Sequence, residues 1–383
     1  MRPYIERKNA GALPASWWSK VLTFGFIADR AGNRRKINWL IFFALGIFLP
    51  GMALYAIYYA VTTPTNPGTW ILAVAMYMFT NLGVTMYYHR LLTHRGYKVT
   101  RRVEYVLAAL AAMTWQGTAT NWVKDHIKHH GYSDIIGLDP HSPWEYRGWR
   151  GLVWAQWFWL FFKVDRLKNT PRILYDEEGN REHKVIRKVV AWQSKPYGYA
   201  LWTSLSLIIP LIAFGLEGLL IAGFLRIAVH MTITGSINSV CHMWGTRTKD
   251  SKGREYVADD SRNNLFVAVV SMGEGNHNGH HSFERSVHHG YKPQLDEESR
   301  LAGVKPDRRW RPDLTYRAIQ LLAWLGFAHD LIVPDKNTVF TPKALVPGKA
   351  LLAVHEIDAI SPRKSRRAAL REIALAKKLT AVS

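Results

Sequence analysis

The chain has one cysteine, Cys241, among its 383 residues. An intramolecular disulfide needs two cysteines and a thiolate cluster needs several, so the chain can form neither kind of site within itself. Residues 1–20 also lack a continuous apolar stretch ahead of a small-residue cleavage site. We therefore expect no disulfide framework and no cleavable signal peptide.

Charged residues are nearly missing from four apolar segments, at about residues 37–61, 69–88, 197–214 and 219–241. Helices of about 18–25 residues are long enough to cross a hydrocarbon core of roughly 30 Å. Very short uncharged links join the first segment to the second and the third to the fourth. This pattern favours four membrane-spanning helices over the alternative, four buried helices of a soluble protein.

Acidic residues are also few, because 29 Asp and Glu stand against 50 Lys and Arg and give a formal net charge of +21. The links 62–68 and 215–218 contain no Lys or Arg, whereas 1–36 contains 8, 89–196 contains 18 and 239–383 contains 23. Lys and Arg accumulate on the cytoplasmic side of membranes. We therefore expect a multi-pass membrane protein with both termini in the cytoplasm, in a bacterial inner membrane or the endoplasmic reticulum. The basic face suits anionic lipids and acidic partners, and nucleic acid is not needed to explain it.

Two further apolar stretches, 105–123 and 149–164, are long enough to resemble membrane spans. A single crossing by either would place histidine clusters on opposite sides of the membrane and carry many basic residues across it. We interpret both as helices at the membrane interface or beneath a cytosolic domain, with Gln116, Asn121 and Trp122 facing an internal cavity. A membrane-surface helix is also predicted at 17–28, and at 361–381 either another such helix or a solvated tail.

Nine of the 16 histidines lie in three clusters and at one single position, each beside an apolar segment. On a helix, positions i, i+3 and i+4 share one face, so His-x-x-His-His presents three imidazoles together. Neutral imidazole is the commonest side-chain metal ligand. The nine candidates are His89 and His94; His126, His129 and His130; His242; and His277, His280 and His281.

Nine nitrogen ligands exceed what one metal ion accepts and suit two. A zinc hydrolase would need only three or four ligands, and haem would use two and leave the His-x-x-His-His spacing unexplained. Soluble di-iron bundles use carboxylates on core helices, whereas all nine candidates here are histidine. Asn238, one helical turn before His242, is placed to reach a metal through a water. A redox-active metal pair at the membrane surface points to oxygen chemistry on lipid-like substrates.

The motifs resemble those of the membrane fatty-acyl desaturases of the stearoyl-CoA desaturase type. They are His-Arg-Leu-Leu-Thr-His-Arg from residue 89, His-Ile-Lys-His-His from 126 and Gly-Glu-Gly-Asn-His-Asn-Gly-His-His from 273. Flanking segments agree: Gly-Leu-Asp-Pro-His at 137–141, Asn-Ser-Val-Cys-His at 238–242 and Asp-Asp-Ser-Arg-Asn-Asn at 259–264. The resemblance covers about residues 37–335, leaving a basic N-terminal segment, 1–36, and a basic C-terminal tail, 336–383.

The resemblance implies an all-α integral membrane protein, with four transmembrane helices under a cytosolic helical cap (89–196 and 242–335) that holds a di-iron site. The nine histidines would bind two non-haem irons, with Asn238 acting through water. The activity would be the insertion of a cis double bond into a saturated acyl chain with O2 and two electrons, delta-9 on acyl-CoA being favoured. The substrate tunnel would bend at Gln116, Trp122 and Thr234, and Tyr77 would limit its length.

The sequence departs from the family pattern at the third cluster, which carries Asn276 and Gly279 and is followed by His288 and His289. These two histidines are candidates for extra ligands or for supporting roles. No His-Pro-Gly-Gly stretch, which would indicate a fused haem domain of the cytochrome b type, occurs in the chain. Electrons would therefore come from a separate partner, a ferredoxin or a cytochrome-b-type protein with a reductase.

Two other functions remain open from the sequence. A lipid hydroxylase or other oxygenase would share the initial hydrogen abstraction with a desaturase. A metal-binding membrane transporter would place ionisable residues together at mid-bilayer. Only Arg226 and His230 lie inside an apolar segment. We expect Arg226 to reach the interface or pair with Glu217, and His230 to form a hydrogen bond to a neighbouring helix.

Overall fold

The computed structural model describes Phe26 and residues 35–146, 148–163, 189–249, 255–257, 259–295, 297–303 and 305–334. Apart from Phe26, the surface helix expected at 17–28 lies outside the described residues, and so does the segment 361–381. The regular secondary structure of the described part is mostly helical, as expected, with one antiparallel pair of two-residue strands, β1 (Lys98–Val99) and β2 (Ala328–His329).

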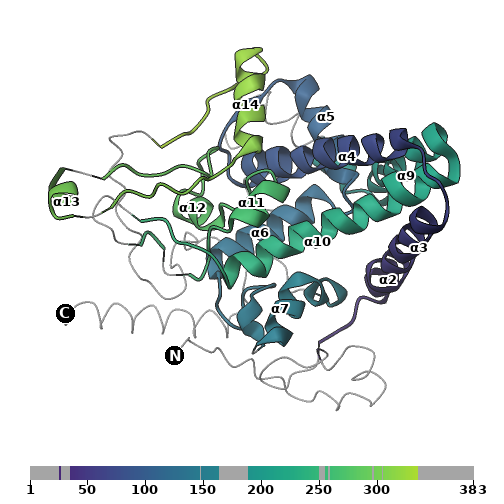
Figure 1. Ribbon diagram of the computed structural model, residues 1–383, viewed down its shortest axis with the longest axis horizontal. Coiled ribbons are helices and arrows are strands. Elements are labelled where there is room, and N and C mark those ends of the chain that lie inside the picture. Colours follow the sequence, from purple (N-terminus) through teal and green to yellow (C-terminus); the bar gives the residue numbers. More distant parts are fainter. Residues whose placement is uncertain are drawn as a thin grey trace.

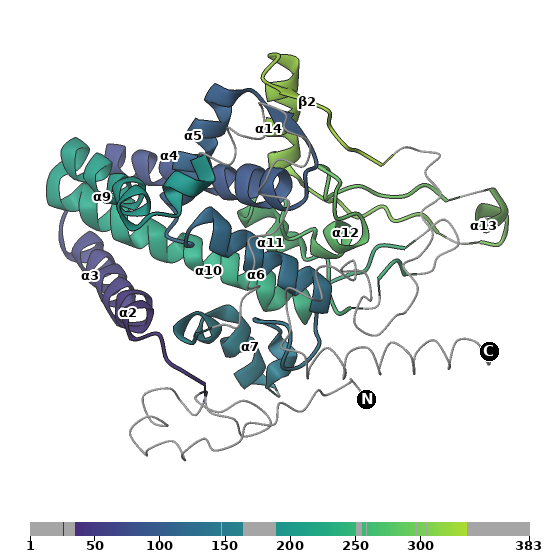
Figure 2. The same ribbon diagram turned by 180° about the vertical axis from the view of Figure 1, so that it is seen from behind.

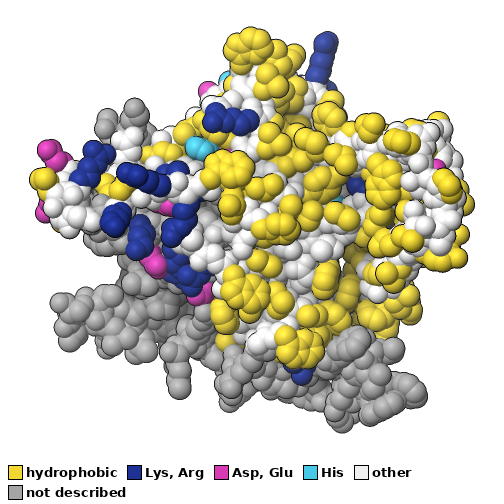
Figure 3. Space-filling view, in the orientation of Figure 1, with side chains coloured by type: hydrophobic (Ala, Val, Ile, Leu, Met, Phe, Trp, Pro, Cys, Tyr) yellow, Lys and Arg dark blue, Asp and Glu magenta, His cyan; other side chains and the backbone are white. Residues whose placement is uncertain are grey.

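Three long helical segments are apolar enough to cross a membrane: Trp39–Thr62, Pro67–Thr93 and Pro196–His242. The first contains α2 (Trp39–Ile41), η1 (Phe42–Phe48) and α3 (Leu49–Thr62), and the second contains α4 (Pro67–Leu82) and η2 (Gly83–Thr93). The third contains α9 (Pro196–Gly218), η6 (Leu219–Leu225), α10 (Arg226–Asn238) and η7 (Val240–His242). Many large apolar side chains on these segments are exposed, and Figure 3 shows them spread over one end of the molecule, which suits contact with lipid.

The third segment is not one straight helix. Its backbone leaves helical geometry at Phe214 and at Gly215, where φ is 59°. Glycine adopts this conformation at little cost, and the chain turns there. The Oε1 atom of Glu217 accepts a hydrogen bond from the backbone N–H of Asn66 at 2.8 Å. The turn at 214–215 therefore lies beside the link between α3 and α4.

Arg226 is buried rather than extended to an interface. Its Nε donates to the carbonyl of Ala222 at 2.8 Å and its Nη1 lies 3.3 Å from Thr80 Oγ1. The expected pairing of Arg226 with Glu217 is wrong, because the Glu217 carboxylate accepts from the backbone N–H of Asn66 instead. Satisfaction by neighbouring helix carbonyls and hydroxyls is the usual solution for a polar group inside a membrane helix.

The expectation for His230 is also wrong. Neither ring nitrogen has a hydrogen-bond partner among the described residues, and the ring is fully buried. It meets the Tyr77 ring edge-on, with 5.5 Å between the centroids. Arg226 and His230 therefore do not form the polar meeting point that a transporter would need.

The apolar stretch 105–123 is not a single helix. It is divided between α5 (Arg101–Ala112) and α6 (Ala119–Tyr132), which are separated by a turn with positive φ at Trp115 and Gly117. The helix α5 crosses η2 so closely that a Cβ at Gly83 would lie 2.4 Å from Ala111 N. Asn121 is exposed, so the expectation that it faces an internal cavity is wrong.

The remaining elements lie mostly at one end of the long helices (Figures 1 and 2). The stretch 149–164 forms α7 (Trp149–Gln156) and η4 (Phe158–Phe161), with η3 (Pro143–Glu145) before it. The later elements are α11 (Leu265–Val270), α12 (His277–Ser282), α13 (Glu297–Leu301) and α14 (Leu314–Trp324). The helix α12 lies near α6 and the end of α10, which brings the histidine clusters to one place.

Glu104, in the first turn of α5, is a buried carboxyl group that affects stability. Its Oε1 lies 3.3 Å from Tyr87 Oη. Burial raises the pKa of Glu104 from 4.5 to about 7. The folded chain therefore binds this proton more tightly than the unfolded chain. The resulting stabilisation is present below about pH 4.5 and is lost as the pH rises through about 7.

We expect Glu104→Gln to remove this pH-dependent loss of stability, because the glutamine amide does not ionise. Relative to the wild type, the variant should gain roughly 1–3 kcal/mol of stability between about pH 5.5 and about pH 8.5. The measurement is thermal or denaturant unfolding of metal-free protein in detergent. The exposed Glu297→Gln variant is the control. Parallel pH profiles for wild type and Glu104→Gln would contradict the prediction.

Candidate metal centre

All nine predicted histidines converge in the structure. They come from η2 and the residue after it, from α6, from η7 and from α12. They form two groups, in each of which the ligand atoms lie within 4.8 Å of one another. The five-histidine group is His89, His94, His126, His130 and His280, and the four-histidine group is His129, His242, His277 and His281.

The local backbone structure explains how the histidines of each cluster come together. The segment η2 is π-helical, so residues five apart come together, and His94 N donates to His89 O at 3.2 Å. In α6, His126 and His130 lie four apart and enter one group, while His129 between them enters the other. A Cβ at Gly279 would lie 2.4 Å from the carbonyl oxygen of His289. Glycine at this position therefore lets the third cluster pack closely against the following loop.

The ring nitrogens of the five-histidine group point at one another. His89 Nε2 lies 3.0 Å from His280 Nε2, and His280 Nε2 lies 2.8 Å from His130 Nε2. His126 Nε2 lies 3.1 Å from the Nε2 atoms of both His94 and His130. In the four-histidine group, His242 Nε2 lies 2.9 Å from His277 Nε2, and His129 Nε2 lies 3.3 Å from His281 Nε2.

Four carboxylates hold the opposite ring nitrogens, and sequence reasoning did not identify them. The Nδ1···O distances are 3.0 Å for His129–Asp139, 2.9 Å for His242–Asp134, 2.9 Å for His281–Asp259 and 2.5 Å for His89–Glu274. Asp139 and Asp259 belong to the flanking segments that resemble the family. Glu274 stands three residues before His277, but the fold brings it to His89 instead.

The pair His129 and His281 shows why these groups fit a metal. Each donates Nδ1–H to a carboxylate, so each Nε2 carries a lone pair and no proton. Two such lone pairs 3.3 Å apart cannot form a hydrogen bond with each other. A cation between them removes the repulsion, and the carboxylates then raise the basicity of the ligands. The residues present therefore fit two metal ions, one in each group.

Burial favours the uncharged form of several of these histidines, which is the form that metal binding requires. Burial and the neighbouring imidazoles lower the pKa of His126, His277 and His280 well below 6.5. Burial also lowers the pKa of His281, to about 4, although Asp259 acts in the other direction. Burial alone would raise the pKa of Asp139, but His129 and His141 bring it below its usual range. The carboxylate therefore stays ionised.

The two extra histidines after the third cluster lie outside both groups. His288 stacks on Tyr316, with 4.3 Å between the ring centroids. His289 is buried, and its Nδ1 lies 3.5 Å from Glu274 Oε2. The His289 ring also lies 4.4 Å from the His280 ring and 5.1 Å from the His89 ring, so His289 directly neighbours the five-histidine group without being a member of it.

Three of the four residues expected at the substrate tunnel lie together. Gln116 Nε2 donates to Thr234 Oγ1 at 2.9 Å, and Trp122 Nε1 donates to Gln116 Oε1 at 3.2 Å. The Trp122 ring lies 4.8 Å from the His126 ring and 5.7 Å from the His89 ring. This polar cluster therefore lies directly beside the five-histidine group.

The fourth expected tunnel residue, Tyr77, and Asn238, which was expected to act through water, lie elsewhere. Tyr77, in α4, donates a hydrogen bond to the carbonyl of Val270 at the end of α11. Asn238 is the last residue of α10, one turn before His242. It is therefore near the four-histidine group along the chain.

Comparison with known proteins agrees with this geometry. A family model described as fatty acid desaturase matches residues 64–312. The chain belongs to the fatty acid desaturase family. It is therefore related to oxidoreductases of lipid metabolism, and its histidine groups and apolar helices suit that family.

The relatives of this chain differ in the group that their names give as carrying the acyl chain. It is 30% identical to an acyl-CoA C20 Delta5-desaturase of Anemone leveillei, over 79% of this chain and 87% of the relative. It is 29% identical to Delta-9 acyl-lipid desaturase 1 of Arabidopsis thaliana, over 81% and 92%. It is 32% identical to a hex-5-enoyl-[acyl-carrier protein] acetylenase of Moorena producens, over 71% and 79%.

We expect Asp139→Asn to weaken metal binding in the four-histidine group by roughly 10–100-fold, because His129 loses its ionised partner. The measurement is iron retained per chain after dialysis against graded chelator. Asp330→Asn is the control, because that carboxylate is 61% exposed and pairs only with Lys98 among the described residues. Unchanged retention in Asp139→Asn would show that the carboxylate does not support the ligand.

Proposed function

We propose that the protein is a fatty acyl desaturase that uses two non-haem irons, one in each histidine group. The supporting observation is the set of converging Nε2 atoms, together with the carboxylates that hold the opposite nitrogens of His89, His129, His242 and His281. In the net reaction a saturated acyl chain, O2, two electrons and two protons yield a cis alkene and two waters. Bound iron would supply the O2 chemistry that an inert C–H bond requires. The protein would position the substrate, exclude water from the site and raise the basicity of the ligands.

The membrane arrangement belongs to the same proposal. The bend at Gly215 divides the third apolar helix into two legs, which would give four crossings in all. Both turns would then lie on one side of the bilayer, with both termini and the cap, residues 89–196 and 242–335, in the cytoplasm. The desaturase domain would extend over 37–335, between a basic N-terminal segment, 1–36, and a basic tail, 336–383.

The polar cluster of Gln116, Trp122 and Thr234 would mark the bend of the acyl chain beside the irons. Its contact with the His89 and His126 rings supports this assignment. A bend fixed by hydrogen bonds would preorganise a cis product and select the carbon by its distance from the head group. Tyr77 would limit chain length, and Asn238 would act on an iron through water. Acyl-CoA with delta-9 selectivity is our proposed substrate and position.

A lipid hydroxylase on the same scaffold is the second candidate, because it would use the same metal groups and the same hydrogen abstraction. Nothing in the arrangement of the histidines separates the two reactions. The identity of the product does, because a desaturase product is two hydrogens lighter than its substrate and a hydroxylase product is one oxygen heavier.

We expect expression in a host that lacks unsaturated fatty acids to produce a new monounsaturated acid, identified by mass spectrometry of its methyl ester. His280→Ala should reduce this product at least about 100-fold, because it removes a ligand of the five-histidine group. The control is Asp330→Asn. A hydroxylated product would favour the second candidate, and protein without bound iron would contradict the metal assignment.

The electron donor would bind the basic docking face, defined here as Arg247, Lys249, Arg262, Lys292 and Arg309. Figure 3 shows Lys and Arg gathered on the side of the molecule where α13 lies. Arg247 Nη2 donates to the carbonyl of Asp259 at 2.6 Å, and Asp259 holds His281. Lys292 Nζ donates to the carbonyl of Arg309 at 2.8 Å, so these two residues of the face are in contact. An acidic one-electron carrier would thus dock close to the four-histidine group.

We expect Arg262→Ser combined with Arg309→Ser to raise the donor concentration needed for half-maximal reduction several-fold. The wild-type rate should fall roughly tenfold as ionic strength rises from about 0.02 M to about 0.5 M, because salt screens the attraction. Stopped-flow reduction of the oxidised irons checks both effects. The exposed Arg102→Ser variant on α5 is the control. Rates indifferent to salt would contradict electrostatic docking.

A further inference from the structure

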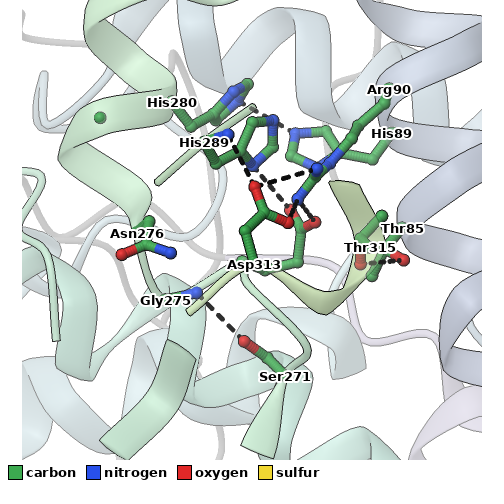
Figure 4. A network of polar contacts seen from close by, with 12 residues as sticks. Thr85, His89, Arg90, Ser271, Gly275, Asn276, His280, His289, Asp313 and Thr315 are labelled. Carbon is green, nitrogen blue, oxygen red and sulfur yellow. Dashed lines mark hydrogen bonds and ion pairs between the residues drawn. The ribbon is translucent and has the colours of Figure 1, made fainter. Parts of the chain in front are cut away.

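Arg90 follows His89 and is buried between two carboxylates. Its side chain is fully buried, and its Nη2 lies 2.9 Å from both Glu274 Oε1 and Asp313 Oδ1. Its Nη1 lies 3.2 Å from Asp313 Oδ2 and also donates to the carbonyl of Val287. Figure 4 shows the carboxylate of Asp313 meeting Arg90 below the rings of His89 and His280. We call Arg90, Glu274 and Asp313 the Arg90 network.

The Arg90 network carries one more negative than positive charge. Both carboxylates are almost completely buried, with side-chain exposures of 5% for Glu274 and 2% for Asp313. One carboxylate would neutralise the guanidinium, and a surplus buried charge is costly unless another cation lies near. The second oxygen of Glu274 accepts from His89 Nδ1, and His89 Nε2 faces the five-histidine group. A metal ion there would balance the surplus charge.

Asp313 joins three separate segments at this point. Its Oδ1 accepts from Tyr316 N at 2.9 Å and so caps the first turn of α14. Its Oδ2 accepts from His289 N at 2.8 Å. A Cβ at Gly273 would lie 2.5 Å from Asp313 Oδ1, so the turn that carries Glu274 packs directly against it. The position of Glu274 is therefore fixed by a residue about forty positions later in the chain.

We propose that Arg90 and Asp313 are positioning residues for the metal of the five-histidine group. They hold Glu274 so that Oε2 accepts from His89 Nδ1, which leaves His89 Nε2 as the free ligand atom. The helix α14 thereby becomes part of the metal centre, although it carries no ligand. The inference rests on the metal centre of the proposed function. It adds that iron binding in the five-histidine group depends on Arg90 and Asp313.

The proposal is tested by measuring whether Asp313→Asn selectively loses the iron of the five-histidine group. Asparagine still caps a helix but cannot pair with Arg90 as a carboxylate does. We expect the five-histidine group to bind iron roughly 10–100-fold more weakly, with the four-histidine group unchanged. Iron per chain is measured against graded chelator, and Mössbauer spectra of isotopically enriched protein identify which iron is lost. Asp139→Asn, which weakens the four-histidine group, assigns the two spectral components.

Arg90→Lys is the second variant, because it keeps the charge and loses the two-pronged geometry. It should lose the same iron as Asp313→Asn, and it gives the same comparison if that variant does not fold. Asp307→Asn is the matched control, because it breaks an ion pair with Arg311, whose other side-chain hydrogen bonds among the described residues go to Thr248 and Tyr291 and to no histidine. Retention of both irons at wild-type affinity, or parallel loss of both, would overturn the proposal. Wild-type protein without iron would instead contradict the proposed function.

Discussion

The structure depends on a set of imidazole lone pairs that point at one another inside a dry site. In the clearest case, His129 and His281 each donate to a carboxylate through one nitrogen and face each other through the other. Such an arrangement is repulsive unless a cation lies between the rings. The carboxylates fix the tautomers of the rings that they contact, and burial favours the neutral form of His281. The nine histidines therefore fit two sets of metal ligands.

The helical framework brings these rings together at one end of the long apolar segments. A π-helical turn aligns His89 with His94, and an α-helical turn sends His129 to one group and its neighbours to the other. Close approaches at Gly83 and Gly279 leave no room for a side chain. The same packing places Trp122 against the five-histidine group, so a substrate chain next to Trp122 would lie next to the metal.

Charge is distributed according to the two surroundings of the molecule. The long apolar helices carry exposed apolar side chains, and Arg226, a cation buried in one of them, is satisfied by a carbonyl and a hydroxyl. Basic residues gather on the side of the molecule where α13 lies. Buried carboxylates in turn gather around the two histidine groups.

The sequence alone determined the helical class, the apolar segments and the nine candidate ligand histidines, because these depend on local spacing and residue type. The desaturase family also follows from motifs that are contiguous in the chain. Tertiary structure decided which histidines share a metal group, that Glu274 serves His89 rather than its sequence neighbour His277, and that Asp313 reaches Arg90. It also overturned the expected partners of Arg226 and His230 and the burial of Asn121. These features depend on contacts between distant segments, which periodicity and spacing do not encode.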